Sequence, residues 1–337
     1  MVNIWQDLLG VSKIGVHDDF FLLGGQSLLA VSLISKINTE MNKDLPLSVL
    51  FQKSTIHDLA ELIEKEQRPW SPLTAVRENG TQTPLFCFFP AGGNIYAYSD
   101  LANALDTDIP FYVLQAVGLE KGQTPINSVE KMAEYYIEWI KSVQPEGPFR
   151  LSGWSFGGLV AFEAARQLKS QGYKIDFLAL FDSSAKNSQE ILNLDMENNA
   201  AFMAGLFAEF ITILPEELQG MSAEGQIRFV LEKAVKQGFV SSDLDVAQAT
   251  RLLNVYKNNG MSAINYRAGA YDGEILLFKP EEESLSAFQY TEQDSQGWEE
   301  VTSDLKIYKV PGKHETMLMA GNVKKLAGIL NNTLLKN

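Results

Sequence analysis

The sequence has little of what builds disulfide frameworks, cysteine-rich metal sites and polyanion-binding surfaces. One cysteine, Cys87, stands among 337 residues, which excludes an internal disulfide and a metal site of several cysteines. A lone cysteine fits a reducing compartment, so we expect a cytoplasmic protein. Lysine and arginine, 28 in all, are outnumbered by 42 aspartate and glutamate residues. Because the formal charge of −14 repels phosphate backbones, nucleic-acid binding is disfavoured.

Long hydrophobic runs and histidines are scarce as well. Apolar stretches such as 84–89 and 177–181 fall far short of the roughly 20 residues that cross a bilayer. The start of the chain, MVNIWQDLLG, lacks a basic, apolar leader. We therefore expect no membrane span and no targeting segment. The three histidines are His17, His57 and His314, so a mechanism with an imidazole base has three candidates.

The pattern of the chain changes near residue 68. Before that point, helical patterns cover 2–9, 27–37 and 55–67, and no strand-like run occurs. The third pattern begins with threonine and has aspartate three residues later, the spacing of a capping box. We predict a bundle of four helices over residues 1–67. The following segment, 68–84, is polar and contains three prolines, as expected of a linker or an edge segment.

Beyond residue 84, short apolar runs alternate with helical patterns of ten or more residues. This alternation indicates parallel strands joined by crossover helices, hence a doubly wound α/β domain over 85–337. The predicted strands are Leu85–Phe89, Phe111–Ala116, Phe149–Gly153, Ile175–Phe181, Glu274–Lys279 and Lys306–Val310. The predicted helices are Tyr96–Leu105, Val129–Val143, Gly157–Gln171 and Val323–Leu335. From 184 to 270 the pattern is helical without a strand, which predicts a helical lid, about 186–265, over the active face.

The clearest chemical signal is GWSFGG at 153–158, a G-x-S-x-G pattern around Ser155. It follows the apolar run FRLSG and opens the helical run GGLVAFEAARQL, the strand–turn–helix setting of a nucleophilic serine. A strained turn there lifts the serine oxygen above the sheet, and the glycines remove side chains that would collide across the bend. The competing interpretation is a glycine-rich turn without a catalytic serine.

A nucleophilic serine needs a base, and a carboxylate usually orients that base. Within the α/β domain the histidine that remains is His314, in the loop between the last strand and the last helix. Asp182 ends the strand that follows the serine unit, while Asp272 and the run Glu281–Glu283 are alternatives. We favour Asp182, because the run is typical of a solvated loop and the order Ser155, Asp182, His314 is that of α/β-hydrolases.

An oxyanion hole requires backbone N–H donors, usually one from the residue after the nucleophile and one from the loop after an early strand. Phe156 supplies the first. Ala91 suits the second, because it lies in FPAGG at 89–93, where small residues let the backbone approach an acyl group. The competing interpretation of this segment is a flexible turn.

In the helical half, the segment DDFFLLGGQSL at 18–28 ends a loop and begins a helix at Ser27. By pattern alone, a serine there is most often an N-cap. The segment also resembles the attachment site of a peptidyl carrier protein, which implies that 4′-phosphopantetheine is esterified to Ser27. A helix N-terminus suits the phosphodiester. Gln26 stands where that family often has His or Asp, which bears on partner recognition and leaves the acceptor hydroxyl in place.

The α/β half resembles the thioesterase domains that end non-ribosomal peptide synthetases, and the related domains of polyketide and fatty-acid synthases. This implies an α/β-hydrolase fold and a peptide or hybrid polyketide product. The resemblance lies in FFPAGG at 88–93, GWSFGG at 153–158, LFDS at 180–183 and PGKH at 311–314. Phe89 stands where the family often has histidine. The family takes its acid from the strand after the nucleophile unit, which again favours Asp182.

The two resemblances together imply a carrier–thioesterase didomain cut from the end of a larger synthetase. They imply that an acyl or peptidyl chain passes from phosphopantetheine on Ser27 to Ser155 and leaves by hydrolysis or macrocyclisation. The implied partners are upstream condensation and adenylation domains, a phosphopantetheinyl transferase, and the carrier docked on its own thioesterase. The alternatives are an editing or free-standing acyl thioesterase with a helical docking module, and a non-catalytic interaction module.

Overall fold

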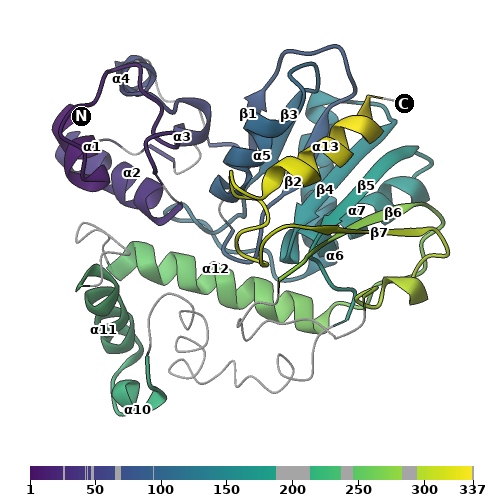
Figure 1. The fold of residues 1–337 in the computed structure, drawn as a ribbon. Coiled ribbons are helices and arrows are strands. Elements are labelled where there is room, and N and C mark those ends of the chain that lie inside the picture. Colours follow the sequence, from purple (N-terminus) through teal and green to yellow (C-terminus); the bar gives the residue numbers. More distant parts are fainter. Residues whose placement is uncertain are drawn as a thin grey trace.

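The computed structural model describes residues 1–25, 27–41, 43, 45–46, 49–64, 70–93, 95–186, 213–236, 246–282 and 294–335. A helical N-terminal part lies beside an α/β part, and one long helix extends from the second to the first (Figure 1). None of the helices in the described ranges is long and apolar enough to span a membrane.

The described N-terminal part contains four helices, and three of them lie where the sequence predicts helix. They are α1 (Val2–Leu9), α2 (Ser27–Met41), α3 (Val49–Gln52) and α4 (Ile56–Glu64). At the start of α4, the Thr55 hydroxyl accepts a hydrogen bond of 3.1 Å from the Asp58 N–H, which is the predicted cap. Trp5 and Phe20 are fully buried, with ring centroids 5.1 Å apart, so the long loop after α1 is packed into the core of this part.

A seven-stranded sheet forms the centre of the described α/β part, in the order β1-β3-β2-β4-β5-β6-β7. The strands are β1 (Leu73–Arg77), β2 (Leu85–Phe88), β3 (Phe111–Leu114), β4 (Phe149–Trp154), β5 (Ile175–Phe181), β6 (Ile275–Pro280) and β7 (Leu305–Val310). All neighbours are parallel except β1 and β3, so the sheet is mixed rather than wholly parallel. Six of these strands lie at their predicted positions.

The seventh, β1, lies inside the segment 68–84 for which the sequence predicts a linker or edge segment. It pairs with β3 alone, antiparallel, at the edge of the sheet. Its flanking prolines, Pro72 and Pro84, stand outside the strand, where they remove no hydrogen bond from the ladder. The predicted linker therefore contributes an edge strand to the α/β part.

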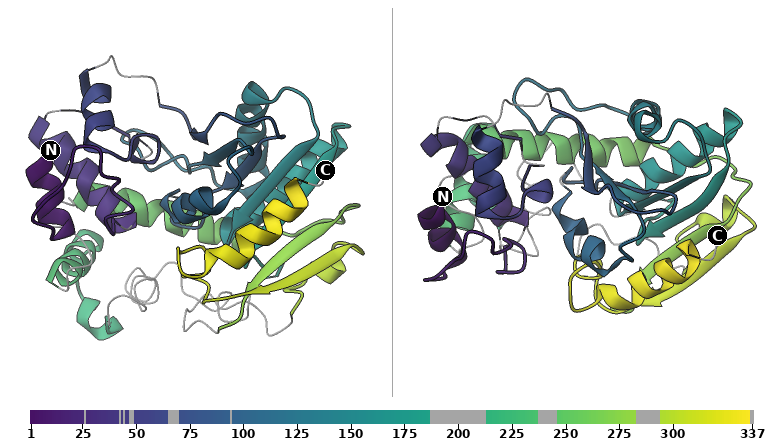
Figure 2. Two further views of the ribbon diagram at one scale, coloured as in Figure 1. Left: turned by 45° about the horizontal axis from the view of Figure 1, so that its top comes forward. Right: turned by 90° about the horizontal axis from the view of Figure 1, so that it is seen from above.

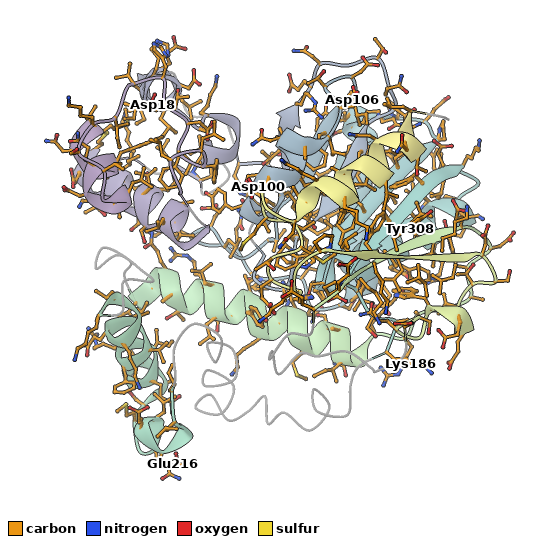
Figure 3. The ribbon with its side chains drawn as sticks, in the orientation of Figure 1. Asp18, Asp100, Asp106, Lys186, Glu216 and Tyr308 are labelled. Carbon is orange, nitrogen blue, oxygen red and sulfur yellow. The ribbon has the colours of Figure 1, made fainter. Side chains whose placement is uncertain are left out.

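Helices cover both faces of the sheet, as the βαβ pattern predicts. On one face α6 (Val129–Val143) packs beside α7 (Phe156–Ser170), and on the other α5 (Ser99–Ala104) packs beside α13 (Val323–Leu334) (Figure 2). Side chains fill the space between the sheet and these helices (Figure 3). This packing buries β2 and β3 completely and presents the carboxyl ends of the parallel strands at one edge.

Between β5 and β6, the described residues form α10 (Pro215–Leu218), α11 (Ala223–Lys236) and α12 (Val246–Asn265). They agree with the helical pattern, without a strand, that the sequence predicts for 184–270. Two parts of that segment, 187–212 and 237–245, lie outside the described residues. In Figure 1, α12 runs from beside α7 to beneath α2, so it links the sheet with the N-terminal part.

Candidate active site

Ser155 stands on a strained turn between β4 and α7. Its φ of 57° and ψ of −125° place a residue with a side chain in a region that usually requires glycine. Its N–H donates a hydrogen bond of 2.9 Å to the Phe181 carbonyl, which ties the turn to β5. A Cβ added to Gly157 would lie 2.3 Å from the Phe88 carbonyl oxygen, and one on Gly153 would lie 2.2 Å from the Gly157 backbone. The two glycines thus have the steric role that the sequence predicts for them.

Asp182 and His314 lie in direct contact at the same edge of the sheet. The His314 Nδ1 is 2.6 Å from the Asp182 Oδ2, and the Asp182 side chain is 8% exposed. Asp182 follows β5 with a positive φ of 43°, and its N–H donates to the Phe278 carbonyl at 2.7 Å. The Trp154 ring lies against the imidazole, with centroids 5.2 Å apart. When Nδ1 carries the proton shared with the carboxylate, Nε2 is the basic nitrogen of the ring.

The other two histidines lie together in the N-terminal part. The rings of His17 and His57 have centroids 4.8 Å apart, and the His57 side chain is 46% exposed beside Asp58. They occupy the loop before α4 and its first turn, which fits their exclusion as bases for Ser155.

Among the described residues, the alternative acids Glu281 and Asp272 have other surroundings. Glu281 forms an ion pair of 2.8 Å with Lys325. Asp272 precedes β6 and therefore lies toward the amino ends of the parallel strands, the opposite edge from Ser155. There, burial and then the charge of Asp272 raise the pKa of Tyr271 to about 12. Residue 283, the last of the glutamate run, lies outside the described residues.

Gln296 is a member of the site that the sequence does not indicate. Its Nε2 donates a hydrogen bond of 2.6 Å to the Asp182 Oδ1, so each oxygen of the carboxylate has a donor. Gln296 is 3% exposed. Its backbone carbonyl accepts hydrogen bonds from the Ser184 hydroxyl at 2.9 Å and the Ala185 N–H at 3.0 Å. The Trp298 Nε1 donates to the Ser183 carbonyl at 2.6 Å. This loop therefore supports the chain directly after β5.

The two predicted oxyanion donors lie on neighbouring strand ends. Ala91 is in the loop after β2, and Phe156 is the first residue of α7 after β4, the strand paired with β2. The rings of Phe89 and Phe156 have centroids 6.0 Å apart, which connects the two segments. The first N–H groups of α7 have no acceptor within the helix and carry its positive dipole end, an environment suited to an oxyanion.

Ser27 is the first residue of α2, at the end of a tightly held loop. The Gly25 N–H donates to the Phe20 carbonyl at 2.9 Å, and a Cβ on Gly25 would lie 2.2 Å from the Phe20 ring. The Asp19 carboxylate accepts from the N–H groups of Phe21 and Leu22 at 2.8 and 3.0 Å. The loop thus fixes the point where α2 begins, and N–H groups there without helical acceptors fit a phosphodiester on a serine hydroxyl.

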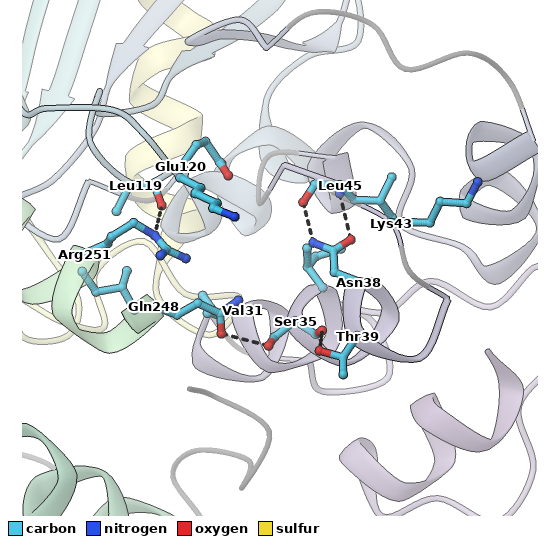
Figure 4. Close-up of a pocket in the computed structure, with 13 residues that line it drawn as sticks. Val31, Ser35, Asn38, Thr39, Lys43, Leu45, Leu119, Glu120, Gln248 and Arg251 are labelled. Atoms are coloured by element: carbon cyan, nitrogen blue, oxygen red, sulfur yellow. Dashed lines mark hydrogen bonds between the residues drawn. The ribbon is translucent and has the colours of Figure 1, made fainter. Parts of the chain in front are cut away.

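The N-terminal part contacts the α/β part through α2, through the loop before it and through α3, which lies against β1. The rings of Phe21 and Tyr96 have centroids 5.9 Å apart, and the Ser35 hydroxyl donates a 2.8 Å hydrogen bond to the Gln248 side chain on α12. Beside this bond is a polar cleft between α2, α12 and the loop at 119–121 (Figure 4). The two parts are therefore docked on the side where α2 faces α12.

Comparison with known families agrees with this division of the chain. Residues 83–334 match the thioesterase domain family, and residues 1–63 match the phosphopantetheine attachment site family. The chain belongs to the thioesterase family. In this thioesterase, a phosphopantetheine attachment site precedes the hydrolase-like domain, which indicates a covalent 4′-phosphopantetheine cofactor on the N-terminal part.

Among its relatives are large synthetases. The thioesterase is 31% identical over 285 residues to the dimodular nonribosomal peptide synthase of Bacillus subtilis, covering 83% of this chain and 12% of that protein. It is 32% identical over 340 residues to tyrocidine synthase 3 of Brevibacillus parabrevis, covering 99% and 5%. The chain thus spans a small part of the length of these relatives.

Solved structures are similar to the whole chain or to its α/β part. A four-domain nonribosomal peptide synthetase bound to AMP and glycine superposes with a TM-score of 0.72 at 29% identity, covering 98% of this chain and 25% of that one. The NocB thioesterase domain in covalent complex with a fluorophosphonate nocardicin G analogue superposes with a TM-score of 0.55 at 24% identity, covering 78% and 100%. The second likeness shows the α/β-hydrolase-like fold.

Proposed function

We propose that this chain releases an acyl or peptidyl chain from a phosphopantetheine thioester, as the last step of non-ribosomal peptide synthesis. The observation that carries the proposal is the hydrogen bond of 2.6 Å between His314 and Asp182, at the sheet edge where Ser155 stands on its strained turn. The synthetases among its relatives support the class of substrate. The partners are then upstream condensation and adenylation domains and a phosphopantetheinyl transferase.

The two parts have separate roles. Residues 1–67 form the carrier, a bundle of the four helices α1–α4, and Ser27 holds the phosphopantetheine, whose thiol carries the chain as a thioester. Residues 85–337 form the α/β-hydrolase domain, joined through 68–84, which includes β1. The helices between β5 and β6 belong to a lid, about 186–265, that limits the access of water.

The catalytic residues divide the work as in other serine hydrolases. The His314 Nε2 takes the proton of the Ser155 hydroxyl, whose oxygen attacks the thioester carbonyl, and the imidazolium then protonates the leaving thiolate. Asp182 orients the ring and stabilises its charged form. The N–H groups of Ala91 and Phe156 bind the oxyanion. The ester on Ser155 then reacts with water, or with an amine or hydroxyl of the chain itself, which yields an acid or a macrocycle.

The proposal is tested by loading Ser27 with acyl-pantetheine from acyl-coenzyme A and a phosphopantetheinyl transferase, then following the intact mass. We expect the acyl group to leave the parent protein and to remain on Ser155→Ala. The control Ser170→Ala changes an exposed hydroxyl at the end of α7 and should release normally. Normal release by Ser155→Ala would contradict the proposed chemistry. Absence of pantetheine on native protein that still hydrolyses esters would favour the free-standing thioesterase with a helical docking module.

A further inference from the structure

The loop that carries Ala91 is packed tightly under α12. Gly93 has a φ of 78°, and a Cβ there would lie 2.7 Å from the Val255 Cγ1 on α12 and 2.8 Å from the Ala116 Cβ. The Gly93 N–H donates to the Pro90 carbonyl at 2.8 Å, which closes a tight turn around Ala91. The position of this turn therefore depends on the position of α12.

One polar side chain of α12 reaches the turn directly. Asn259 is 1% exposed, and its Nδ2 donates a hydrogen bond of 2.9 Å to the Ala91 carbonyl oxygen. The N–H and the carbonyl of Ala91 are separated by its own φ and ψ alone. With the carbonyls of Pro90 and Ala91 both engaged, the peptide that carries the Ala91 N–H has little freedom to rotate.

α12 is itself held by the α/β part at several points along its length. The Asn258 Nδ2 donates to the Ile126 carbonyl at 2.6 Å, and the Arg251 Nε donates to the Leu119 carbonyl at 3.1 Å. Near the end of the helix, the Tyr266 hydroxyl donates to the buried Glu163 of α7 at 2.8 Å. These bonds tie α12 to the connection after β3 and to the helix that follows Ser155.

We propose that Asn259 is a positioning residue for the oxyanion hole, through which α12 sets the direction of the Ala91 N–H. The inference rests on the proposed function, in which this N–H binds the oxyanion. An oxyanion donor is effective only when it lies about 2.7–3.1 Å from the position where the charged oxygen forms. A small rotation of the peptide therefore weakens the stabilisation of the transition state. Binding of the uncharged substrate depends less on that geometry. Loss of Asn259 should therefore lower kcat and leave KM nearly unchanged.

The neighbouring residue provides a matched control. Asn258 is also an α12 asparagine that donates to a backbone carbonyl, at 2.6 Å, but this acceptor lies at Ile126, outside the proposed oxyanion loop. Its Nδ2 makes in addition a long hydrogen bond of 3.4 Å to the Asn259 Oδ1, which leaves the Asn259 donor to Ala91 intact when it is removed. The variants to compare are Asn259→Ala, Asn259→Asp and Asn258→Ala in the full chain. Asn259→Asp keeps the size of the side chain and removes the donor, so it tests the role if the alanine variant unfolds. Circular dichroism and the thermal midpoint establish that each variant is folded.

Two measurements decide the proposal: kcat and KM on a p-nitrophenyl ester, and the rate at which a fluorophosphonate labels Ser155. We expect Asn259→Ala and Asn259→Asp to lower kcat and the labelling rate by about tenfold with KM within about twofold, since deleting an oxyanion donor outright costs about 100-fold or more. Asn258→Ala should stay within about twofold in all three. Equal losses of kcat and labelling rate in the folded Asn258 and Asn259 variants would overturn the inference, and so would no loss in the Asn259 variants. In either case, labelling of Ser155 in the parent protein would still uphold the proposed function. A parent protein that is never labelled would overturn both.

Discussion

The Asp182 carboxylate is held through both of its oxygens, and the two donors differ in kind. His314 contacts Oδ2 and gains a proton during the proposed reaction, whereas the neutral Gln296 amide donates to Oδ1 at 2.6 Å. A neutral donor stabilises the negative charge of the carboxylate without changing its own charge. Gln296 and His314 together therefore fix the direction of the carboxylate.

Removing that donor should slow the reaction of Ser155. In Gln296→Ala the Asp182 Oδ1 loses its hydrogen bond, so the carboxylate is held less firmly against His314. We expect the rate at which a fluorophosphonate labels Ser155 to fall by roughly threefold to tenfold, which corresponds to about 0.7–1.4 kcal/mol. The control is Gln82→Ala, which removes an amide that donates to the Asp108 carboxylate at 3.2 Å and should leave the labelling rate within about twofold of the parent. An unchanged labelling rate in folded Gln296→Ala would reduce Gln296 to a packing role.

The single cysteine yields a second prediction at this scale. Cys87 is fully buried in β2, and burial raises the pKa of its thiol to about 12. At pH 8 about one thiol in 10,000 is then a thiolate, the reactive form. We expect iodoacetamide to leave Cys87 unmodified in the native protein at pH 8 and to alkylate it after unfolding in guanidinium. The measurement is the intact mass of the protein without phosphopantetheine, whose own thiol would also react. Alkylation of Cys87 in the native state would contradict the burial of this thiol.

The residues of the site were predictable to different degrees. Ser155 and His314 follow from a motif and from the scarcity of histidine, and Asp182 from its place after β5. Gln296 carries no such signal, because it comes 114 residues after Asp182 in a polar loop without periodicity, and only the folded chain brings the two together. Asn259 is hidden for a similar reason, since an asparagine within an amphipathic helix is typical of its polar face.

Among the elements, α12 is linked to α7 through Tyr266, which directly follows α12 and donates a hydrogen bond to a buried acid. Glu163 is 1% exposed and accepts hydrogen bonds from Arg166 at 2.8 and 2.9 Å, from Gln167 at 2.8 Å and from Tyr266 at 2.8 Å. Burial, followed by the charge of Glu163, raises the pKa of the Tyr266 hydroxyl, so it remains a donor throughout the working pH range. The hydroxyl is therefore a fixed link between α12 and α7.

Deleting this hydroxyl should destabilise the protein. Tyr266→Phe removes one hydrogen bond to a buried carboxylate, a loss of about 1.5–3 kcal/mol in the free energy of unfolding. Tyr135→Phe, in a half-buried tyrosine of α6, is the control and should change it by less than about 0.5 kcal/mol. Urea unfolding followed by circular dichroism measures both. Equal stability of the two variants would show that Arg166 and Gln167 suffice to hold Glu163.

The elements themselves show where sequence patterns succeed. The ranges of α1 and α6 are predicted to the residue, because each has one apolar face with clear ends. β1 is predicted only as part of a linker or edge segment, because its five residues, mostly half-buried at a sheet edge, lack a strong apolar run. The link between Glu163 and Tyr266 joins residues 103 apart, and no local pattern records it.

At the scale of the whole molecule, the described contacts of the carrier with the thioesterase involve α2, the loop before it and α3. They include the Phe21–Tyr96 ring pair and the hydrogen bond of 2.8 Å between Ser35 and Gln248. The two parts belong to one chain, so even weak contacts are populated at the high effective concentration that the connection provides. These contacts place the start of α2, with Ser27, on the side of the carrier that faces η1 (Tyr96–Tyr98) and α12.

Loss of the docking contacts should slow the transfer from the carrier and spare the chemistry. In Phe21→Ala combined with Gln248→Ala, we expect release of the acyl group from loaded Ser27 to slow by about threefold to tenfold, which corresponds to about 0.7–1.4 kcal/mol. Hydrolysis of a p-nitrophenyl ester, which bypasses the carrier, should stay within about twofold of the parent rate. Gln219→Ala, an exposed glutamine after α10, is the control for both assays. A fall in release alone would show that these contacts dock the carrier. A fall in both rates would contradict this and show that the contacts support the thioesterase fold itself. The expected loss is moderate because the two parts remain connected in one chain, which keeps their effective concentration high.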